Sequence, residues 1–412
     1  MKPTRSKFTV MRQLVAMIPA GMVGRLAKEH GVEKRSRSFS AWSHVVSLIF
    51  AQVSHALSLN DVCDTLRHHS GALATVRGAT PPSRNGLSHA NKVRNADMGE
   101  ALFWEMLKHL QSISPKFGLG HGHSGMPRRF KRMIHIVDST TIQLIMNCMN
   151  CMNCMDWAKH RRRKAAAKCH MRLNLQNFLP AFAIVKEADT HDSREAHALC
   201  QGIKAGEIVV FDKAYVDFEH LGLLDQRDVF WVTRAKENMA YTVVGTFSEP
   251  KGHILKDEEI RLTGKAAEKD YPQTCRRITA QVVVDGEDKL MTFITNNTVW
   301  APSSVCDLYK ARWAIEVFFK QLKQTLQLAD FLGHSKQAVR WQIWMALLTY
   351  VLLRFIAFQS KWKGSFARLF TILRGILWET LAIDSVIACC GTADPPRIIA
   401  APAQAYLPGF QF

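Results

Sequence analysis

The sequence predicts an α/β protein in which a mixed β-sheet domain, carrying an inserted β-rich segment, lies between two helical regions. Three patterns predict this fold class. Apolar residues recur every three or four positions before residue 117 and again after residue 330, as on amphipathic helices. Between these regions, short apolar runs alternate with helical stretches, and a block of alternating apolar and polar residues follows. The 412 residues suffice for two or three domains.

Residues 1–116 are predicted to form a helical DNA-binding domain. Ser83 or Asn85, after a Thr-Pro-Pro turn, is positioned to cap a helix that carries basic and amide side chains. Residues 1–132 contain 20 Lys and Arg against 7 Asp and Glu, a net charge of +13, while the remainder carries only +6 of the total +19. This asymmetry favours a polyanionic partner, above all nucleic acid. The alternative is a helical bundle whose basic faces only contact solvent.

Residues 117–132 are predicted to be a Gly- and His-rich basic linker. A Gly-x-Gly-x-x-Gly pattern from Gly120 to Gly125 has the form of a dinucleotide-binding fingerprint. That fingerprint works only between a strand and a helix, whereas Pro127 and a basic run follow here. No dinucleotide site is therefore expected.

Residues 133–234 are predicted to form the first part of an α/β core, a mixed five-stranded sheet. The expected strands are Met133–Val137, Met171–Leu175, Ala181–Val185, Glu207–Phe211 and Val229–Val232, with a helix around Ser193–Gly202. Residues 235–300 form the β-rich insertion. One long helix from about Ser303 to Gln327 dominates residues 301–330, and residues 331–412 are a helical C-terminal region.

Membrane embedding and a disulfide framework are not expected. The longest largely apolar stretch, Ile343–Leu353, has 11 residues, short of the ~20 that a membrane span needs. Ten cysteines are irregularly spaced, which indicates a reducing cytoplasm. Cys148, Cys151 and Cys154 lie in a tripeptide, Asn-Cys-Met, that is repeated three times over residues 147–155. We interpret it as a duplication that lengthens a connection rather than as a metal site.

Three acids stand out by their positions. Asp138 and Asp212 each follow an apolar strand, and Glu316 lies on the long helix. Ligands and metals usually bind at the carboxyl ends of strands in an α/β sheet. An all-oxygen site suits Mg²⁺ or Mn²⁺, and two such ions promote phosphoryl transfer. The alternative for each Asp is a turn or helix-cap residue.

The segment around Glu316 carries a polar stripe. Tyr309, Arg312, Glu316 and Lys323 are spaced by three, four and seven residues, so they share one face of a helix. This composition is wrong for an apolar core and right for a face that holds a metal ion and binds phosphates. The alternative is an exposed, salt-bridged helix face.

A basic cluster lies between the first two strands of the core. Arg161, Arg162, Arg163 and Lys164 follow one another directly. Near a catalytic edge they would neutralise substrate phosphates. The alternative is a solvated loop.

With these motifs in place, the sequence resembles DDE transposases of bacterial insertion sequences, in the branch marked by a Y-R-E-K signature (the insertion-sequence-four family). The signature reads Tyr309, Arg312, Glu316, Lys323. The stretch from Ile136 to Ile142 resembles the family's first-Asp motif, and Val209 to Tyr215 resembles its second. Asp212 and Glu316 are 104 positions apart in the sequence, and the β-rich block between them matches the family's insertion. The resemblance covers nearly the whole chain.

The resemblance implies an RNase H-like core and cut-and-paste DNA transposition. Asp138, Asp212 and Glu316 would bind the catalytic metals, Mg²⁺ or Mn²⁺, two ions together. Tyr309, Arg312 and Lys323 would contact the transposon-end DNA, and Trp300 would hold a flipped base.

The implied partner is double-stranded DNA, both the terminal inverted repeats and the target, bound by a homodimer on paired ends. The implied location is the bacterial cytoplasm, at the nucleoid. Two alternatives stay open: an RNase H-like metal-dependent nuclease without strand transfer, and an inactive transposase-derived DNA-binding protein.

Overall fold

The computed structural model describes residues 2–33, 39–118, 130–144, 159–160, 164–187, 192–284, 287–326, 332–333 and 335–390. The chain divides into two compact units. Unit 1 comprises Met1–Gly118, Ile142–Ala167 and Phe319–Ile398, and unit 2 comprises Leu119–Thr141, Lys168–Phe318 and Ile399–Phe412. The Asn-Cys-Met repeat lies outside the described residues.

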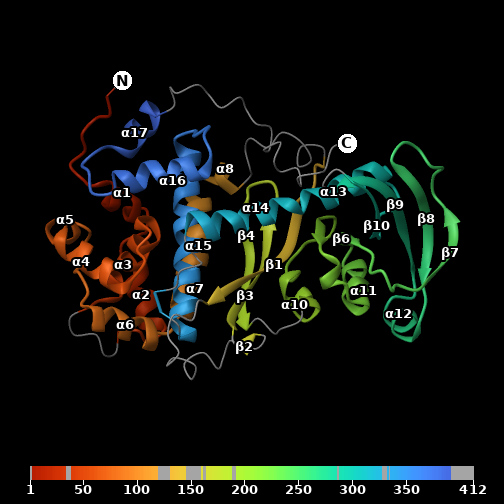
Figure 1. Cartoon of the computed structure of the whole chain (residues 1–412), viewed down its shortest axis with the longest axis horizontal. Helices are drawn as coiled ribbons and strands as arrows, with labels where there is room; N and C mark the ends of the chain where they lie inside the picture. Colours follow the sequence, from red (N-terminus) through yellow and green to blue (C-terminus); the bar gives the residue numbers. More distant parts are fainter. Residues whose placement is uncertain are drawn as a thin grey trace. The chain divides into compact units, whose positions relative to one another are not determined.

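Unit 1 is mainly helical (Figure 1). Its N-terminal helices are α1 Val10–Ala16, α2 Met22–Glu29, α3 Ala41–Ser54, α4 Leu59–His68, α5 Ser70–Ala74, α6 Arg84–Val93, α7 Asp97–Ile113 and α8 Pro115–Gly118. Its C-terminal part contains the π-helical turn η4 Gln321–Thr325 and the helices α15 Lys336–Gln359, α16 Phe366–Gly375 and α17 Ile383–Cys389. Ser83 caps α6 by accepting a hydrogen bond from the Gly86 amide, at 3.0 Å, as one of the two sequence alternatives predicts.

Helix α15 is the centre of unit 1, packed on α7 and α3. The apolar stretch noted in the sequence is only its middle, because Ser335 starts the helix well before Ile343. By length and composition α15 qualifies as a membrane span, and 83% of its qualifying window is buried inside the protein. Within the described residues, α3 and α4 qualify only when taken together, and they are bent by 104°. A buried core helix meets the same criteria.

The described strands form one ten-stranded mixed sheet in the order β2-β3-β1-β5-β6-β10-β9-β8-β7, with β4 paired to β3 (Figure 1). The strands are β1 Ile134–Leu144, β2 Lys159–His160, β3 Lys164–Asn174, β4 Leu179–Glu187, β5 Ile208–Phe211, β6 Phe230–Arg234, β7 Tyr241–Thr246, β8 Ile254–Leu262, β9 Thr274–Val284 and β10 Glu287–Thr295. The five predicted core strands correspond to β1, β3, β4, β5 and β6. The inserted strands join the core sheet, because β10 pairs antiparallel with β6.

Strands β1, β5 and β6 are parallel neighbours, and their apolar residues form the core of unit 2. Every residue of β5 is buried, as expected for a parallel strand covered on both faces. The helices α10 Asp192–Leu199 and α11 Phe218–Gln226 supply the residues packed on this core, and the short helices η3 Lys213–Tyr215 and α12 Lys265–Asp270 complete the unit.

The long helix predicted over residues 303–327 is interrupted, so that prediction is wrong in its continuity. The chain forms α13 Pro302–Ala311, a turn at Arg312, α14 Trp313–Lys320 and then η4. At the break, the amides of Arg312 and Ile315 donate to carbonyls three residues earlier, at 3.1 Å each. Such tighter hydrogen bonds in mid-helix often mark a functional hinge. Periodicity alone does not detect the break, because the apolar spacing continues through it.

Candidate active site

Asp138 and Asp212 lie at the same level of two adjacent strands. The parallel register of β1 and β5 ends with Val137 opposite Phe211, so these two acids are the next residues of each strand. Asp138 does not end its strand, contrary to the prediction. Strand β1 continues to Leu144 because it also pairs with β3 on its other side.

Backbone amides fix one oxygen of each aspartate. The Ser139 amide donates to Asp138 Oδ1 at 2.7 Å, and the Ala214 amide donates to Asp212 Oδ1 at 3.1 Å. Asp212 is therefore also the N-cap of η3, which was the alternative reading of its sequence position. The cap leaves Oδ2 of Asp212 directed to other groups.

Arg312 joins the acids. Its Nη1 donates to Asp138 Oδ2, and its Nη2 donates to Glu316 Oε1 at 2.9 Å. The side chains of Arg312 and Asp138 are each 15% exposed and that of Glu316 is 34% exposed. Two carboxylates, Asp138 on β1 and Glu316 on α14, thus share the Arg312 guanidinium.

The charges of these groups are coupled. Burial raises the pKa of Asp138 to about 6, although Arg312 and the Ser139 amide oppose the shift. Burial also raises the pKa of Glu316, again opposed by Arg312. Burial disfavours the charge of Arg312, but Asp138, Tyr309 and Glu316 outweigh it and raise the pKa of the guanidinium. The Arg312 guanidinium is therefore the cation that stabilises the negative charges of Asp138 and Glu316 inside the protein.

Tyr309 connects the helix to the second strand. Its hydroxyl donates to Asp212 Oδ2 at 3.4 Å, and its ring lies 5.6 Å from the Arg312 guanidinium carbon. Burial raises the pKa of the Tyr309 hydroxyl to about 12, so it stays a hydrogen-bond donor at neutral pH. Tyr309, Arg312 and Glu316 therefore all face the two aspartates, as the predicted shared helix face requires.

The donors at this site fit a hard divalent cation in chemistry. Asp138, Asp212 and Glu316 offer only carboxylate oxygens, which Mg²⁺ and Mn²⁺ prefer, and a cationic guanidinium already lies among them. As they lie, however, the described residues contain no group of three or more His, Cys, Asp or Glu close enough to hold a metal ion. Arg312 already binds Asp138 Oδ2 and Glu316 Oε1, so an ion that took these oxygens would replace its hydrogen bonds.

Comparison with known proteins identifies the family. Residues 129–352, which include all three acids and the helices around Arg312, match the family described as "Transposase DDE domain". The chain belongs to this family. Residues 6–76 match a second family, described as a domain of unknown function (DUF4372).

Individual relatives of this transposase domain are insertion-sequence proteins. "Putative transposase y4zB" of Sinorhizobium fredii is 31% identical over 56% of this chain and 62% of its own length. "Probable transposase for insertion sequence element IS5377" of Geobacillus stearothermophilus is 26% identical over 57% of this chain and 59% of its own length. "Transposase InsG for insertion sequence element IS4" of Escherichia coli is 25% identical over 42% and 40%.

These matches confirm the resemblance to DDE transposases of bacterial insertion sequences, whereas the Y-R-E-K branch stays a prediction. The chain spans about three fifths of the length of the first two relatives.

Trp300 lies inside an aromatic cluster of the transposase domain. Its ring centroid is 5.3 Å from that of Phe130 and 5.1 Å from that of Phe230. Its carbonyl accepts a hydrogen bond from Arg276 at 2.6 Å. The same side chain lines an open cavity of about 290 Å³. These contacts anchor the start of α13, and the predicted contact of Trp300 with a flipped base stays a prediction.

The remaining predicted DNA-binding residues belong to other segments of the chain. Lys323 lies on η4, in unit 1. Lys164 begins β3, opposite His160 of β2. Arg161, Arg162 and Arg163 lie outside the described residues. Their assignment stays a prediction.

Sequence reasoning missed Arg234, the last residue of β6. Phe211 pairs with Thr233, so Arg234 is level with Asp212 in the parallel register. Its charge lowers the pKa of the Tyr309 hydroxyl, opposing the effect of burial. Within the described residues, no hydrogen bond or ion pair engages its guanidinium. Its place at the end of an apolar strand, as with Asp212, was the clue available in the sequence.

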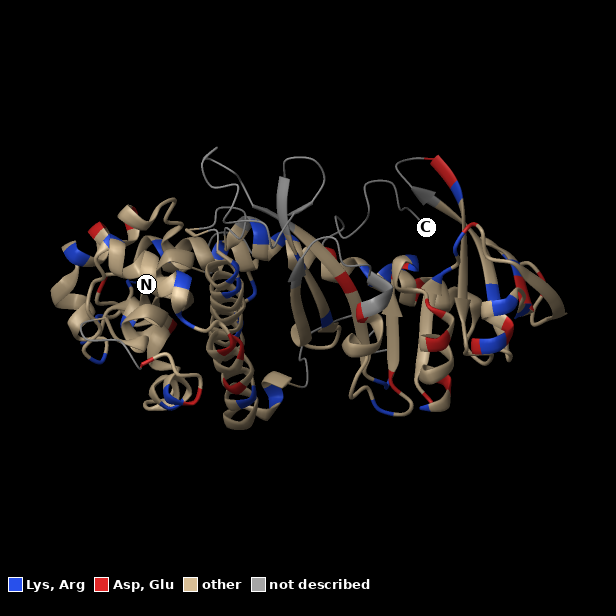
Figure 2. Ribbon diagram, turned by 90° about the horizontal axis from the view of Figure 1, so that it is seen from below, with Lys and Arg blue, Asp and Glu red and all other residues tan. Residues whose placement is uncertain are grey.

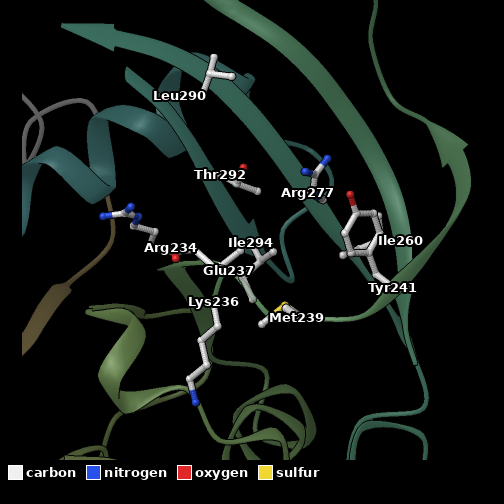
Figure 3. Close-up of a pocket in the computed structure, with 11 residues that line it drawn as sticks. Arg234, Lys236, Glu237, Met239, Tyr241, Ile260, Arg277, Leu290, Thr292 and Ile294 are labelled. Carbon is white, nitrogen blue, oxygen red and sulfur yellow. The ribbon is translucent and has the colours of Figure 1, made fainter. Parts of the chain in front are cut away.

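Arg234 also lines a cavity of about 230 Å³ between β6 and the inserted strands (Figure 3). The lining is Arg234, Ala235, Lys236, Glu237, Met239, Tyr241, Ile260, Arg277, Leu290, Thr292 and Ile294. Arg277 lies over the Tyr241 ring at 4.6 Å, and its guanidinium is paired with Glu258. The lining of this cavity therefore combines guanidinium groups with an aromatic ring.

Proposed function

We propose that this chain is a DNA transposase that moves an insertion sequence by cut-and-paste transposition. The carrying observation is that Arg312 binds Asp138 and Glu316, and Tyr309 of the same segment binds Asp212, within the matched transposase domain. In the proposed reaction, a water oxygen attacks phosphorus at the element's end and releases a 3′-hydroxyl. That hydroxyl oxygen then attacks a phosphorus of the target DNA and displaces a 3′-oxygen of the target.

The strand order supports an RNase H-like catalytic core. Strands β4-β3-β1-β5-β6 are consecutive in the sheet, and β1, β5 and β6 are parallel. We propose that residues 133–234 and the Glu316-bearing helices constitute this core and that residues 235–300 are its insertion. The insertion adds β7–β10 to the same sheet.

Asp138, Asp212 and Glu316 would hold the divalent ions, Mg²⁺ or Mn²⁺, and we propose two of them. When bound, such ions activate the attacking oxygen and stabilise the leaving oxygen of an in-line phosphoryl transfer. Arg312 supplies a planar fork that matches two phosphate oxygens. Tyr309 orients Asp212 through its hydroxyl. The Ser139 amide orients Asp138.

The partner proposed is double-stranded DNA, the terminal inverted repeats and the target. Helix α6 supports this, because Arg84, Ser88 and Lys92 are exposed at intervals of four residues on one face. Figure 2 shows both signs of charge on the helices of unit 1 and along the inserted strands. A homodimer on paired ends and action at the nucleoid in the bacterial cytoplasm belong to the same proposal.

A cleavage assay tests the proposal. A plasmid carrying the gene with its native flanking DNA is incubated with Mg²⁺ and the wild-type chain, Glu316→Gln or Glu219→Gln. Glu219 is the matched control, because it is also an acid in the first turn of a helix of unit 2 but is exposed on α11. Paired cuts at the element ends by wild type and Glu219→Gln, absent with Glu316→Gln, are expected.

The same assay separates the alternatives. Cutting without joining of the released ends to a second plasmid would indicate a metal-dependent nuclease. Retention of the DNA without cutting by all three proteins would indicate an inactive DNA-binding protein.

A further inference from the structure

The guanidinium of Arg312 occupies the centre of the acidic site. It contacts Asp138 through one nitrogen and Glu316 through the other, with 15% of its side chain exposed. Its Nε is buried and has no hydrogen-bond partner in the described residues. A cation bound by two carboxylates in this way neutralises the charge that a divalent ion would otherwise neutralise.

We propose that Arg312 is an internal counter-ion that competes with divalent metal for these carboxylates, and that a phosphate of the bound DNA end draws it away. This inference rests on the proposed function, since it assigns the metal and the DNA to the same site. It makes metal loading dependent on DNA: without DNA the guanidinium holds the acids, and with DNA it binds phosphate and releases them.

Two observations favour competition over coexistence. Arg312 already binds Asp138 Oδ2 and Glu316 Oε1, and the Ser139 amide binds Asp138 Oδ1, so an ion that ligated both acids would compete for oxygens that the guanidinium holds. A divalent ion within a few ångströms of a guanidinium is also strongly repelled in a site as buried as this one. One of the two cations has to leave.

The chain provides a way for Arg312 to leave. The residue lies at the break between α13 and α14, where the helix hydrogen bonds skip to the shorter i→i−3 pattern. Its side chain reaches Asp138 and Glu316 from this break, so rotamer changes move the guanidinium while Glu316 stays on α14. A guanidinium binds phosphate in the same bidentate manner as it binds carboxylate. Hydrogen bonds to a DNA phosphate can therefore replace those that Arg312 loses from the carboxylates.

Mn²⁺ binding, followed by the electron paramagnetic resonance of free Mn²⁺, tests the inference without relying on cleavage. The full-length chain is titrated alone and with a pre-cut duplex taken from the gene's flanking DNA. Without DNA, Arg312→Gln is expected to bind Mn²⁺ about 5- to 150-fold more tightly than wild type. DNA is expected to tighten Mn²⁺ binding by wild type by a comparable factor and to change Arg312→Gln little, because the competing cation is already gone.

Arg25→Gln is the matched control, since Arg25 also bridges two carboxylates, Glu29 and Glu105, but is exposed in unit 1. It is expected to bind Mn²⁺ like wild type. Arg312→Lys keeps the charge but loses the fork, so its affinity without DNA is expected between those of wild type and Arg312→Gln. If Arg312→Gln does not fold, judged by circular dichroism, Arg312→Lys decides the result.

Equal or weaker Mn²⁺ binding by the Arg312 variants without DNA would overturn the competition. Unchanged Mn²⁺ binding by wild type on adding DNA would overturn the coupling. Asp138→Asn separates these failures from failure of the proposed function. If that variant binds Mn²⁺ as wild type does, the acids are not the metal site and the proposed function itself fails.

Discussion

Removing the carboxylate of Asp257 is expected to destabilise the protein strongly. Asp257 on β8 and Arg276 on β9 form a bidentate ion pair, with contacts of 2.6 and 2.7 Å and side-chain exposures of 0% and 3%. Asp257→Ala leaves the buried guanidinium without its counter-charge, which costs about 3–5 kcal/mol. For a cooperative unit of this size, about 2–4 °C per kcal/mol gives a loss in Tm of about 6–20 °C.

Glu258 provides a control one residue away. It pairs with Arg277 at 2.6 Å, but both side chains keep 14–15% exposure to solvent. Glu258→Ala is therefore expected to cost about 1 kcal/mol, because water replaces part of the lost interaction.

Differential scanning calorimetry of the full-length variants measures the shifts, and hydrogen exchange of β8 and β9 peptides locates them. Equal Tm losses for Asp257→Ala and Glu258→Ala would refute the reasoning that burial sets the cost. Arg276 also holds the Trp300 carbonyl at the start of α13. We therefore expect Asp257→Ala to lose cleavage as well, in contrast to Glu258→Ala.

Two further predictions concern the acids and their neighbour. Because burial raises the pKa of Asp138 to about 6, a proton competes with metal below that pH. Mn²⁺ affinity is expected to fall about tenfold per pH unit below pH 6 and to level off above it. If the Mn²⁺ titration followed by electron paramagnetic resonance gives an affinity that does not change with pH, Asp138 is not a metal ligand. Arg234→Gln is expected to weaken DNA binding and to reduce the slope of log affinity against log salt by about 1, measured by fluorescence anisotropy. Arg261→Gln, exposed on β8, is the control, and equal slopes for the two variants would count against a phosphate contact by Arg234.

The sequence was sufficient for the parts of the fold that local pattern controls. The apolar run of β5 is fully buried, and Ser83 caps α6 as its position after the Pro turn predicts. The two aspartates lie side by side because both follow runs of parallel strands. These features depend on residues close together in the chain, so periodicity and cap chemistry detect them.

The parts that sequence reasoning missed depend on pairing between distant segments. Asp138 lies within β1 rather than at its end, because β3 extends the strand from the other side. The insertion joins the main sheet because β10 pairs antiparallel with β6, which is distant in the sequence. The ion pairs of Arg312 with Asp138 and Glu316 were not predicted either, because no local spacing in the sequence reveals them.

The pairing of β10 with β6 also changes where the sheet ends. Without residues 235–300, β6 would be the border of the catalytic sheet, with its backbone amides and carbonyls open and Trp231 in the strand. An open, apolar edge of that kind recruits strands from other chains and causes aggregation. The insertion moves this edge to β7, far along the sheet from the acids. Because Tyr241, Val243 and Val244 of β7 are exposed, the insertion transfers the open edge along the sheet, and a chain trimmed of residues 235–300 would be expected to expose β6 in its place.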